Sequence, residues 1–265
     1  MSEQTITQGT ESAASILWHN WQRRTRIDEL PMACRPIDRA AGYRAQQELV
    51  KTSGQPVVGW KIAATSAAGQ KHIGVDGPLA GPLLANRVLG NGATVPLDGN
   101  IMLVAEAEFA FMFARALPGR AGAYTQAEVL AAVDSLHPSI EVPDSRYNDF
   151  AHVGAPQLIA DTACACWFVL GPATAADWRA RDLVTHAVTA YRNGEPAGTG
   201  SGANVLGDPR VALTWLVNEL NTFGDGIAAG QFVTTGTCVI PVAIKPGDRF
   251  RADFGELGAV EVALT

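Results

Sequence analysis

In the stretch Ile101-Met-Leu-Val-Ala-Glu-Ala-Glu-Phe-Ala-Phe-Met-Phe113, two carboxylates interrupt one of the most apolar parts of the chain. If this stretch is a strand, Glu106 and Glu108 point to the same face, because side chains two residues apart share a side. Two like charges on a buried face repel each other, and burying them without partners costs several kcal/mol. A divalent cation removes both penalties, since carboxylate oxygens suit hard ions such as Mg²⁺, Mn²⁺ or Ca²⁺.

An exposed edge strand is the competing interpretation of this pair, because antiparallel strands often turn a polar face to water. The alternation of apolar and polar residues is poor here, however. Val104, Ala110 and Met112 lie on the same side as the two glutamates. The pair alone therefore leaves both interpretations open.

A third carboxylate, Glu141, lies downstream in Ser139-Ile-Glu-Val-Pro-Asp-Ser-Arg146, between two apolar residues. Two acids on one strand and one on a neighbouring strand would form an open coordination site for a hard divalent ion. The remaining positions would be left to water or substrate. An ion pair with Arg146, or an exposed strand face, is the other interpretation of Glu141.

Lys61 interrupts a further apolar run, Pro56-Val-Val-Gly-Trp-Lys-Ile-Ala-Ala64. A lysine in such a strand either extends its ammonium group to solvent or serves a buried anion. Asp76 lies in Gly74-Val-Asp-Gly-Pro-Leu-Ala-Gly-Pro82, which is rich in turn residues and predicts a loop. The simplest interpretation of Asp76 is a turn residue.

The composition is that of a globular protein: the 265 residues are 47% hydrophobic and 17% charged. A net charge of −6, a pI of about 5.4 and the lack of a Lys/Arg run argue against nucleic acid or an anionic membrane surface as a partner. No apolar run reaches the roughly 18 residues of a membrane span, and the N-terminus lacks the pattern of a secretory signal. The cysteines lack the C-x-x-C spacing of a zinc site, so free thiols in a reducing cytoplasm are expected; they are Cys34, Cys164, Cys166 and Cys238.

Helix signals are strongest near the N-terminus, where helices are expected over residues 11–27 and from Asp38 to about Thr52, closed by Gly54. Another helix is expected from Thr125, because Glu128 completes a capping-box pattern. A fourth is expected from Asp208-Pro209 to about Gly224, because an N-cap residue is followed by proline.

Strand signals dominate the rest of the chain, and Asn193-Gly194 predicts a two-residue hairpin turn. Strands and helices do not alternate regularly, which predicts an α+β fold rather than a doubly wound sheet. The expected strands are 57–64, 101–114, 138–143, 164–170, 183–192, 231–235, 248–254 and 258–264.

Motifs of other enzyme classes are missing from the sequence. Gly198-Thr-Gly-Ser-Gly202 does not follow a βαβ pattern, which argues against a dinucleotide site. The chain has no Gly-x-Ser-x-Gly motif of a serine hydrolase, and its five histidines lack metal-ligand spacing.

A set of ordered motifs does match a known pattern. They are Gly59-Trp-Lys-Ile-Ala-Ala-Thr-Ser66, Gly74-Val-Asp-Gly-Pro78, Glu106-Ala-Glu108, Ile140-Glu-Val-Pro-Asp-Ser-Arg146, Phe168-Val-Leu-Gly171, Gly202-Ala-Asn-Val-Leu-Gly-Asp-Pro209 and Pro246-Gly-Asp-Arg-Phe-Arg-Ala-Asp-Phe-Gly255. Over about residues 38–265, the chain resembles the 2-keto-4-pentenoate hydratase / 2-oxohepta-3-ene-1,7-dioate hydratase / 4-oxalocrotonate decarboxylase family. That family belongs to the fumarylacetoacetate hydrolase superfamily.

The resemblance implies a mixed β-sheet roll with outer helices. We expect an N-terminal helical region over residues 1–78 and a catalytic β-roll domain over residues 79–265. The resemblance also implies that Glu106, Glu108 and Glu141 hold Mg²⁺ or Mn²⁺, and that the chain forms homo-oligomers.

The resemblance further implies that Lys61 and Asp76 act in proton transfer. The residues expected to contact substrate are Thr65, Cys164, Gly236 and Thr237. Two departures from the family pattern fall where substrate would be bound. Asp161-Thr-Ala-Cys-Ala165 has a cysteine in place of a serine, and the loop Thr235-Gly-Thr-Cys-Val-Ile-Pro241 is shorter than usual.

The implied activity is that of a cytoplasmic, metal-dependent hydratase in aromatic or related catabolism. It would add water to a 2-hydroxy-2,4-dienoate of the 2-oxopent-4-enoate type and release a 4-hydroxy-2-oxo acid. Three alternatives stay open: a decarboxylase of a 2-oxo-3-enedioate such as 4-oxalocrotonate, an acylpyruvate C–C hydrolase, and a non-catalytic assembly subunit.

Overall fold

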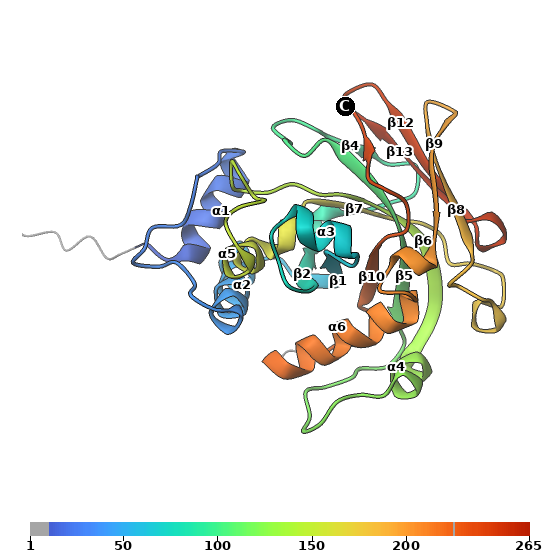
Figure 1. Cartoon of the computed structure of the whole chain (residues 1–265), viewed down its shortest axis with the longest axis horizontal. Coiled ribbons are helices and arrows are strands. Elements are labelled where there is room, and N and C mark those ends of the chain that lie inside the picture. The colour runs from blue at the N-terminus through green and yellow to red at the C-terminus, as the bar shows by residue number, and fades with distance from the viewer. Residues whose placement is uncertain (1–10, 225) are drawn as a thin grey trace, which may run out of the picture.

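The computed structural model describes residues 11–224 and 226–265. Two β-sheets with helices packed outside them make up most of this described part (Figure 1). The predicted α+β fold, a mixed β-roll with outer helices, is confirmed. Residues 1–10 lie outside the described residues. The expectation of no secretory signal rests mostly on these ten residues.

The larger sheet has eight strands in the described chain: β1 (Val57–Ala63), β2 (Leu79–Leu84), β3 (Val88–Gly90), β5 (Val104–Phe113), β6 (Val133–Val142), β7 (Trp167–Leu170), β10 (Phe232–Thr237) and β11 (Val242–Ala243). Their order is β2-β1-β10-β5-β6-β7-β3, and β11 also pairs with β5. β1 runs parallel to β10, and β3 runs parallel to β7, whereas the other pairs are antiparallel. β1 thus belongs to this sheet, although it precedes residue 78, where the boundary between the two expected regions was placed. That boundary stays a prediction.

The smaller sheet has the order β4-β13-β12-β8-β9. Its strands are β4 (Thr94–Val95), β8 (Ala187–Arg192), β9 (Glu195–Ser201), β12 (Arg249–Asp253) and β13 (Ala259–Leu264). β12 and β13 contact β6 of the larger sheet, and apolar side chains fill the space between them. Phe109 and Phe254, for example, meet edge to face with ring centroids 5.0 Å apart.

The helices are α1 (Ala13–Arg23), α2 (Arg39–Ser53), α3 (Ala67–His72), α4 (Gln126–Ala132), α5 (Ala155–Ala160) and α6 (Pro209–Phe223). Short 3₁₀ turns cover Ala85–Arg87, Thr162–Cys164, Trp178–Ala180, Gly202–Asn204 and Gly255–Leu257. α1, α2 and α5 form a group at one end of the molecule, while α6 packs on β10 and contacts α4 (Figure 1). No helix of the described chain is long and apolar enough to cross a membrane.

Local sequence signals predicted the ends of several helices. The capping box of Thr125 and Glu128 is formed in full at α4. Asp208 caps α6 through the Arg210 N–H, and Gly224 ends that helix in the left-handed conformation. The predicted hairpin is also confirmed, since Asn193 and Gly194 have φ values of 55° and 86° between β8 and β9.

Other local predictions were wrong at particular residues. The expected loop 74–82 contains the start of β2 at Leu79. The strand expected over 164–170 begins only at Trp167, because Thr162, Ala163 and Cys164 have φ values of 54°, 51° and 64°. β9 was not predicted, because Glu195-Pro-Ala-Gly-Thr-Gly-Ser201 has weak strand propensity and becomes a strand through pairing with β8.

Helix and strand lengths also differ from the expectations. The first helix ends at Arg23 rather than at residue 27, because Arg24 is left-handed. β8 starts at Ala187 instead of residue 183, and β6 starts at Val133 instead of residue 138. α3 and α5 have six residues each, too few for a clear helical period in the sequence.

Candidate active site

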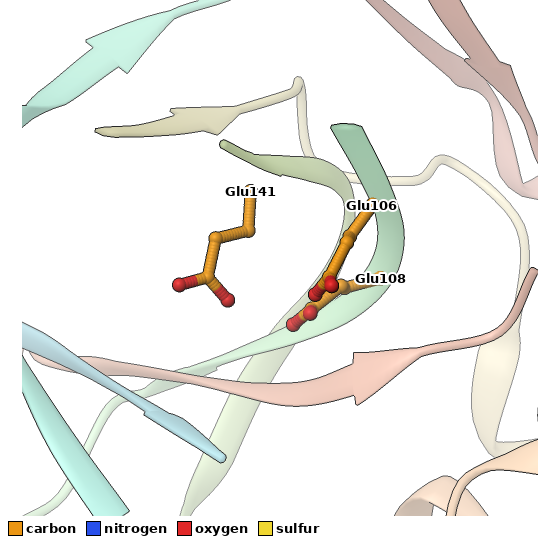
Figure 2. A group of neighbouring side chains, drawn as sticks. All are labelled: Glu106, Glu108 and Glu141. Atoms are coloured by element: carbon orange, nitrogen blue, oxygen red, sulfur yellow. The ribbon is translucent and has the colours of Figure 1, made fainter. Parts of the chain in front are cut away.

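Three carboxylates converge on one point between β5 and β6 (Figure 2). Glu106 and Glu108 come from β5, and Glu141 comes from β6. The antiparallel register places Glu141 directly opposite Glu106. One oxygen from each of the three side chains lies within 4.8 Å of the others. The i, i+2 spacing and the strand register together therefore build a three-carboxylate cluster.

Burial decides between the two interpretations of these acids. The exposed fraction of both Glu108 and Glu141 is 0%, so neither lies on an exposed strand face. Glu106 is half-buried and forms the open side of the cluster. Arg146 does not pair with Glu141, because its guanidinium binds Asp161.

Lys61 supplies the positive charge beside the cluster. Its Nζ lies 3.2 Å from Glu141 Oε1 and donates to the Ala163 carbonyl oxygen at 2.9 Å. The exposed fraction of Lys61 is 3%, which excludes an ammonium group that extends to solvent. Gly81 is paired with Lys61 across β1 and β2, and a Cβ there would lie 2.0 Å from the Thr162 carbonyl oxygen. The missing side chain therefore lets the left-handed turn approach and orient Lys61.

Glu108 is held from β10. Its Oε2 accepts from the Thr234 hydroxyl and, at 3.0 Å, from the Gly236 N–H. Sequence reasoning missed Thr234, although two adjacent threonines in an otherwise apolar strand were a usable signal. Ser139 adds a hydrogen bond of 2.8 Å to the backbone carbonyl of Glu108. These contacts fix one carboxylate oxygen and leave the other free.

The residues expected to contact substrate lie in two places, one beside Lys61 and the other at the end of β10. Cys164 is buried close to Lys61. Thr65 packs against Gly236, where an added Cβ would lie 2.3 Å from Thr65 Oγ1. Thr237 is paired with Glu108 in the sheet, and its hydroxyl donates to the Val239 carbonyl at 2.5 Å.

Asp76 is the one predicted site residue that lies apart from the cluster in the described chain. It is exposed in the bend between α3 and β2. The structure records no hydrogen bond or ion pair between Asp76 and the described residues of the cluster. Its assignment to proton transfer stays a prediction.

Burial makes the cluster unfavourable without a bound cation. It raises the pKa of Glu106, Glu108 and Glu141, and the neighbouring carboxylates raise that of Glu108 further. The pKa of Glu141 reaches about 7, although Lys61 opposes the rise. Burial also opposes the charge on Lys61, but the carboxylates around it outweigh this effect and raise its pKa. The pKa of the Cys164 thiol is raised by burial to about 12, so the thiol is neutral.

We expect the metal-free protein to lose stability as the pH rises from about 4.5 to about 7. The folded-state pKa of Glu141 is about 7, above its usual 4.5, so the folded state binds more protons than the unfolded chain in this window. This contribution to stability is complete below about pH 4.5 and is lost as the pH rises through the folded-state pKa of Glu141. Thermal unfolding midpoints with a chelator present measure this slope. Glu141→Gln should flatten it, and a midpoint that rises with pH over the window would contradict the prediction.

Open cavities occur elsewhere in the structure. One of about 560 Å³ is lined by β12 and β13, and one of about 460 Å³ lies between β9 and the Val239–Ala243 segment. No predicted site residue lines either cavity.

Residues 54–265 match the model of the fumarylacetoacetate (FAA) hydrolase C-terminal family. The chain is 36% identical over 242 residues to 2-keto-4-pentenoate hydratase of Burkholderia vietnamiensis, covering 90% of this chain and 91% of that protein. It is 34% identical over 224 residues to 4-oxalocrotonate decarboxylase of Pseudomonas putida, covering 83% of each.

Solved structures show the same relationship. The structure of 4-oxalocrotonate decarboxylase from Pseudomonas putida G7, complexed with magnesium and adipate, matches with a TM-score of 0.85. The two chains are 29% identical, and the match covers 96% of each. A second structure of that protein, complexed with calcium and acetate, matches with a TM-score of 0.84. From the family match, these similarities and the fold, the chain is an enzyme that belongs to the fumarylacetoacetate (FAA) hydrolase C-terminal family.

Proposed function

We propose that this protein is a metal-dependent hydratase of a 2-hydroxy-2,4-dienoate, with a 4-hydroxy-2-oxo acid as product. The observation that carries the proposal is the cluster of three carboxylates, Glu106, Glu108 and Glu141, with the Lys61 ammonium beside it. Its occurrence in a chain 36% identical to proteins named 2-keto-4-pentenoate hydratase supports the choice of reaction.

The donor set fits a hard divalent cation. Glu108 Oε1 and Glu141 Oε2 are buried and accept no hydrogen bond from the described residues, and Glu141 Oε1 has the Lys61 ammonium 3.2 Å away as its ion-pair partner. When all groups are ionised, three carboxylates and the Lys61 ammonium leave two negative charges. Mg²⁺ or Mn²⁺ would restore neutrality and supply the missing partners for these oxygens. We therefore propose that the three glutamates hold this ion.

A bound ion supplies a Lewis acid that favours negative charge on the C2 oxygen of a 2-oxo acid. The rest of the chemistry belongs to the side chains of the chain. Lys61 has three N–H donors, and Ala163 and Glu141 engage two of them. The third is available to hydrogen-bond the substrate and to hold or release a proton there. Glu106, on the open side, faces the direction from which substrate and water would arrive.

Decarboxylation of a 2-oxo-3-enedioate is the second candidate, because a 4-oxalocrotonate decarboxylase structure matches with a TM-score of 0.85. A diacid needs a cation for its second carboxylate. Arg146 is the buried arginine near Cys164, and Asp161 already engages it. Lys61 is engaged by Glu141. The buried lysine and the buried arginine of the described chain are thus both paired within the protein, which favours a monoacid substrate and hence the hydratase.

Product analysis distinguishes these reactions. The purified protein, with Mg²⁺ or with chelator, is given 2-hydroxypenta-2,4-dienoate, 4-oxalocrotonate or an acylpyruvate. We expect Mg²⁺-dependent water addition to the monoacid. Carbon dioxide release from the diacid should be at least about 100-fold slower, the scale at which an apolar pocket discriminates against a substrate with an added polar group. Faster carbon dioxide release would identify a decarboxylase, and cleavage of the acylpyruvate would identify a hydrolase. Glu106→Ala is the inactive control, and equal turnover without metal would contradict metal dependence.

A further inference from the structure

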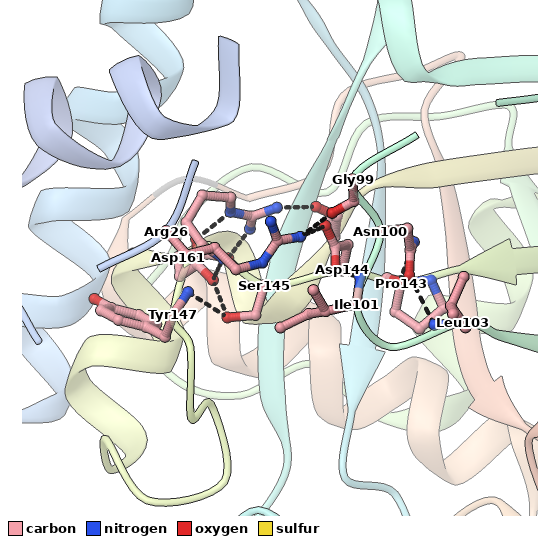
Figure 3. A network of polar contacts seen from close by, with 12 residues as sticks. Arg26, Gly99, Asn100, Ile101, Leu103, Pro143, Asp144, Ser145, Tyr147 and Asp161 are labelled. Carbon is pink, nitrogen blue, oxygen red and sulfur yellow. Dashed lines mark hydrogen bonds and ion pairs between the residues drawn. The ribbon is translucent and has the colours of Figure 1, made fainter. Parts of the chain in front are cut away.

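The segment that follows α1 reaches across to the two strands that carry the carboxylate cluster (Figure 3). The Arg26 guanidinium donates to the Gly99 carbonyl in the loop that enters β5. The same group pairs with Asp144 Oδ2 at 2.5 Å, in the segment that leaves β6. The exposed fraction of both side chains is 11%, so this ion pair is largely shielded from water. One side chain of the N-terminal region therefore contacts both strand ends.

The two strand ends are also tied directly to each other. Asp144 Oδ1 accepts from the Ile101 N–H at 3.0 Å. Asn100 donates to the Pro143 carbonyl at 2.9 Å and accepts from the Leu103 N–H at 2.8 Å (Figure 3). Leu103 has a φ of 46°, an uncommon value for a non-glycine residue that these contacts hold in place.

These contacts lie close to the carboxylates along the chain. β5 starts right after Leu103, with Glu106 as its third residue, and Glu141 is two residues before Pro143. Because Glu106 and Glu141 face each other in the register, the spacing between their carboxylates depends on how these two strand ends are held.

We infer that Arg26 is a positioning residue for the carboxylate cluster: it sets the separation of Glu106 and Glu141 by clamping the start of β5 to the end of β6. This inference rests on the proposed function, since it takes the cluster to be the metal site. Without Arg26, Asp144 loses its cationic partner and the Gly99 carbonyl loses its donor. The strand ends are then held by the hydrogen bonds of Asn100 and Asp144 and by the pairing of β5 with β6. Arg26 acts through the backbone of the two strands and contacts none of the three carboxylates directly. Loss of a group that supports metal ligands typically changes metal affinity by about 10- to 100-fold.

Titration of the full-length protein with Mn²⁺, followed by electron paramagnetic resonance, tests the inference without any activity assay. Arg26→Ala should raise the Kd for Mn²⁺ by about 10- to 100-fold, with an unchanged circular dichroism spectrum. Arg24→Ala is the matched control, because Arg24 reaches the same loop through an exposed ion pair with Asp98 at 3.0 Å. Its Kd should stay within about twofold of the wild type, as expected for an exposed pair.

A milder variant keeps the test decisive if Arg26→Ala fails to fold. Arg26→Lys retains the charge but not the guanidinium geometry in which Nη2 donates to both Gly99 and Asp144, so its Kd should rise by a smaller factor of about 3 to 10, below the about 10- to 100-fold of a lost supporting contact. Wild-type affinity in a folded Arg26→Ala or Arg26→Lys protein, or an equal loss in Arg24→Ala, would overturn the inference alone. A wild-type protein that binds no Mn²⁺ would instead overturn the proposed function, and the inference with it.

Discussion

Glu108→Gln is expected to abolish metal binding and activity while it stabilises the metal-free protein. The substitution keeps the shape of the side chain, and an amide oxygen can still accept from Thr234 and Gly236. The amide NH₂ takes the place of Oε1, which has no hydrogen-bond donor, and can donate to the neighbouring carboxylates. It also removes a carboxyl group whose charged form is disfavoured, since burial, Glu141 and Glu106 raise its pKa well above normal. We therefore expect a higher melting temperature in chelator.

The same substitution removes one of the three proposed ligands, so kcat/KM should fall by roughly 1,000-fold, the upper end of the scale seen when a preorganised stabilising group is lost. Turnover with Mg²⁺ and thermal unfolding in chelator measure the two effects on one preparation. Glu256→Gln is a suitable control, because Glu256 is exposed and pairs with Arg181 on the surface. A variant with near-wild-type turnover would remove Glu108 from the proposed site. A lower melting temperature in chelator would show that the cluster is not under electrostatic strain.

Arg146→Met is expected to cost the most stability, about 3–5 kcal/mol of unfolding free energy. The exposed fractions of Arg146 and Asp161 are 3% and 0%, and the guanidinium also donates to the Ala165 carbonyl and the Thr162 hydroxyl. It lies over the Trp21 ring at 4.1 Å from the centroid. Methionine fills similar volume but leaves the Asp161 carboxylate buried without its cation.

Urea unfolding at an unchanged m-value measures this loss. Arg181→Met is the matched control, because its ion pair with Glu256 is exposed and should be worth about 0–1 kcal/mol. Adding Asp161→Asn to Arg146→Met should recover part of the loss, since asparagine is neutral and can still accept from Ser145. If Arg146→Met costs less than about 1 kcal/mol, the Arg146–Asp161 pair does not hold the turn at residues 162–164.

Much of the local structure was predictable because it depends on residues close together in the chain. The capping box at Thr125 and the Asn193-Gly194 turn are decided within four residues. The shared face of Glu106 and Glu108 follows from strand geometry alone. The left-handed turn at Thr162–Cys164 was not predictable, since these residue types rarely adopt positive φ without outside support. That support comes from distant Arg146 and from the room left by Gly81.

The sequence by itself determined which chemical groups this protein can bring to a site. Two carboxylates share one strand face, a further carboxylate lies in a second apolar strand, and a lysine lies in yet another apolar strand. Only the tertiary structure decided that they meet. The register of β5 and β6 places Glu141 opposite Glu106, and burial at 0% exposure removes the water that would screen Glu108 and Glu141. Tertiary packing also left Asp76 outside the cluster. The physical reason is that side-chain direction is a local property of the backbone, whereas register and desolvation depend on contacts between residues far apart in the sequence.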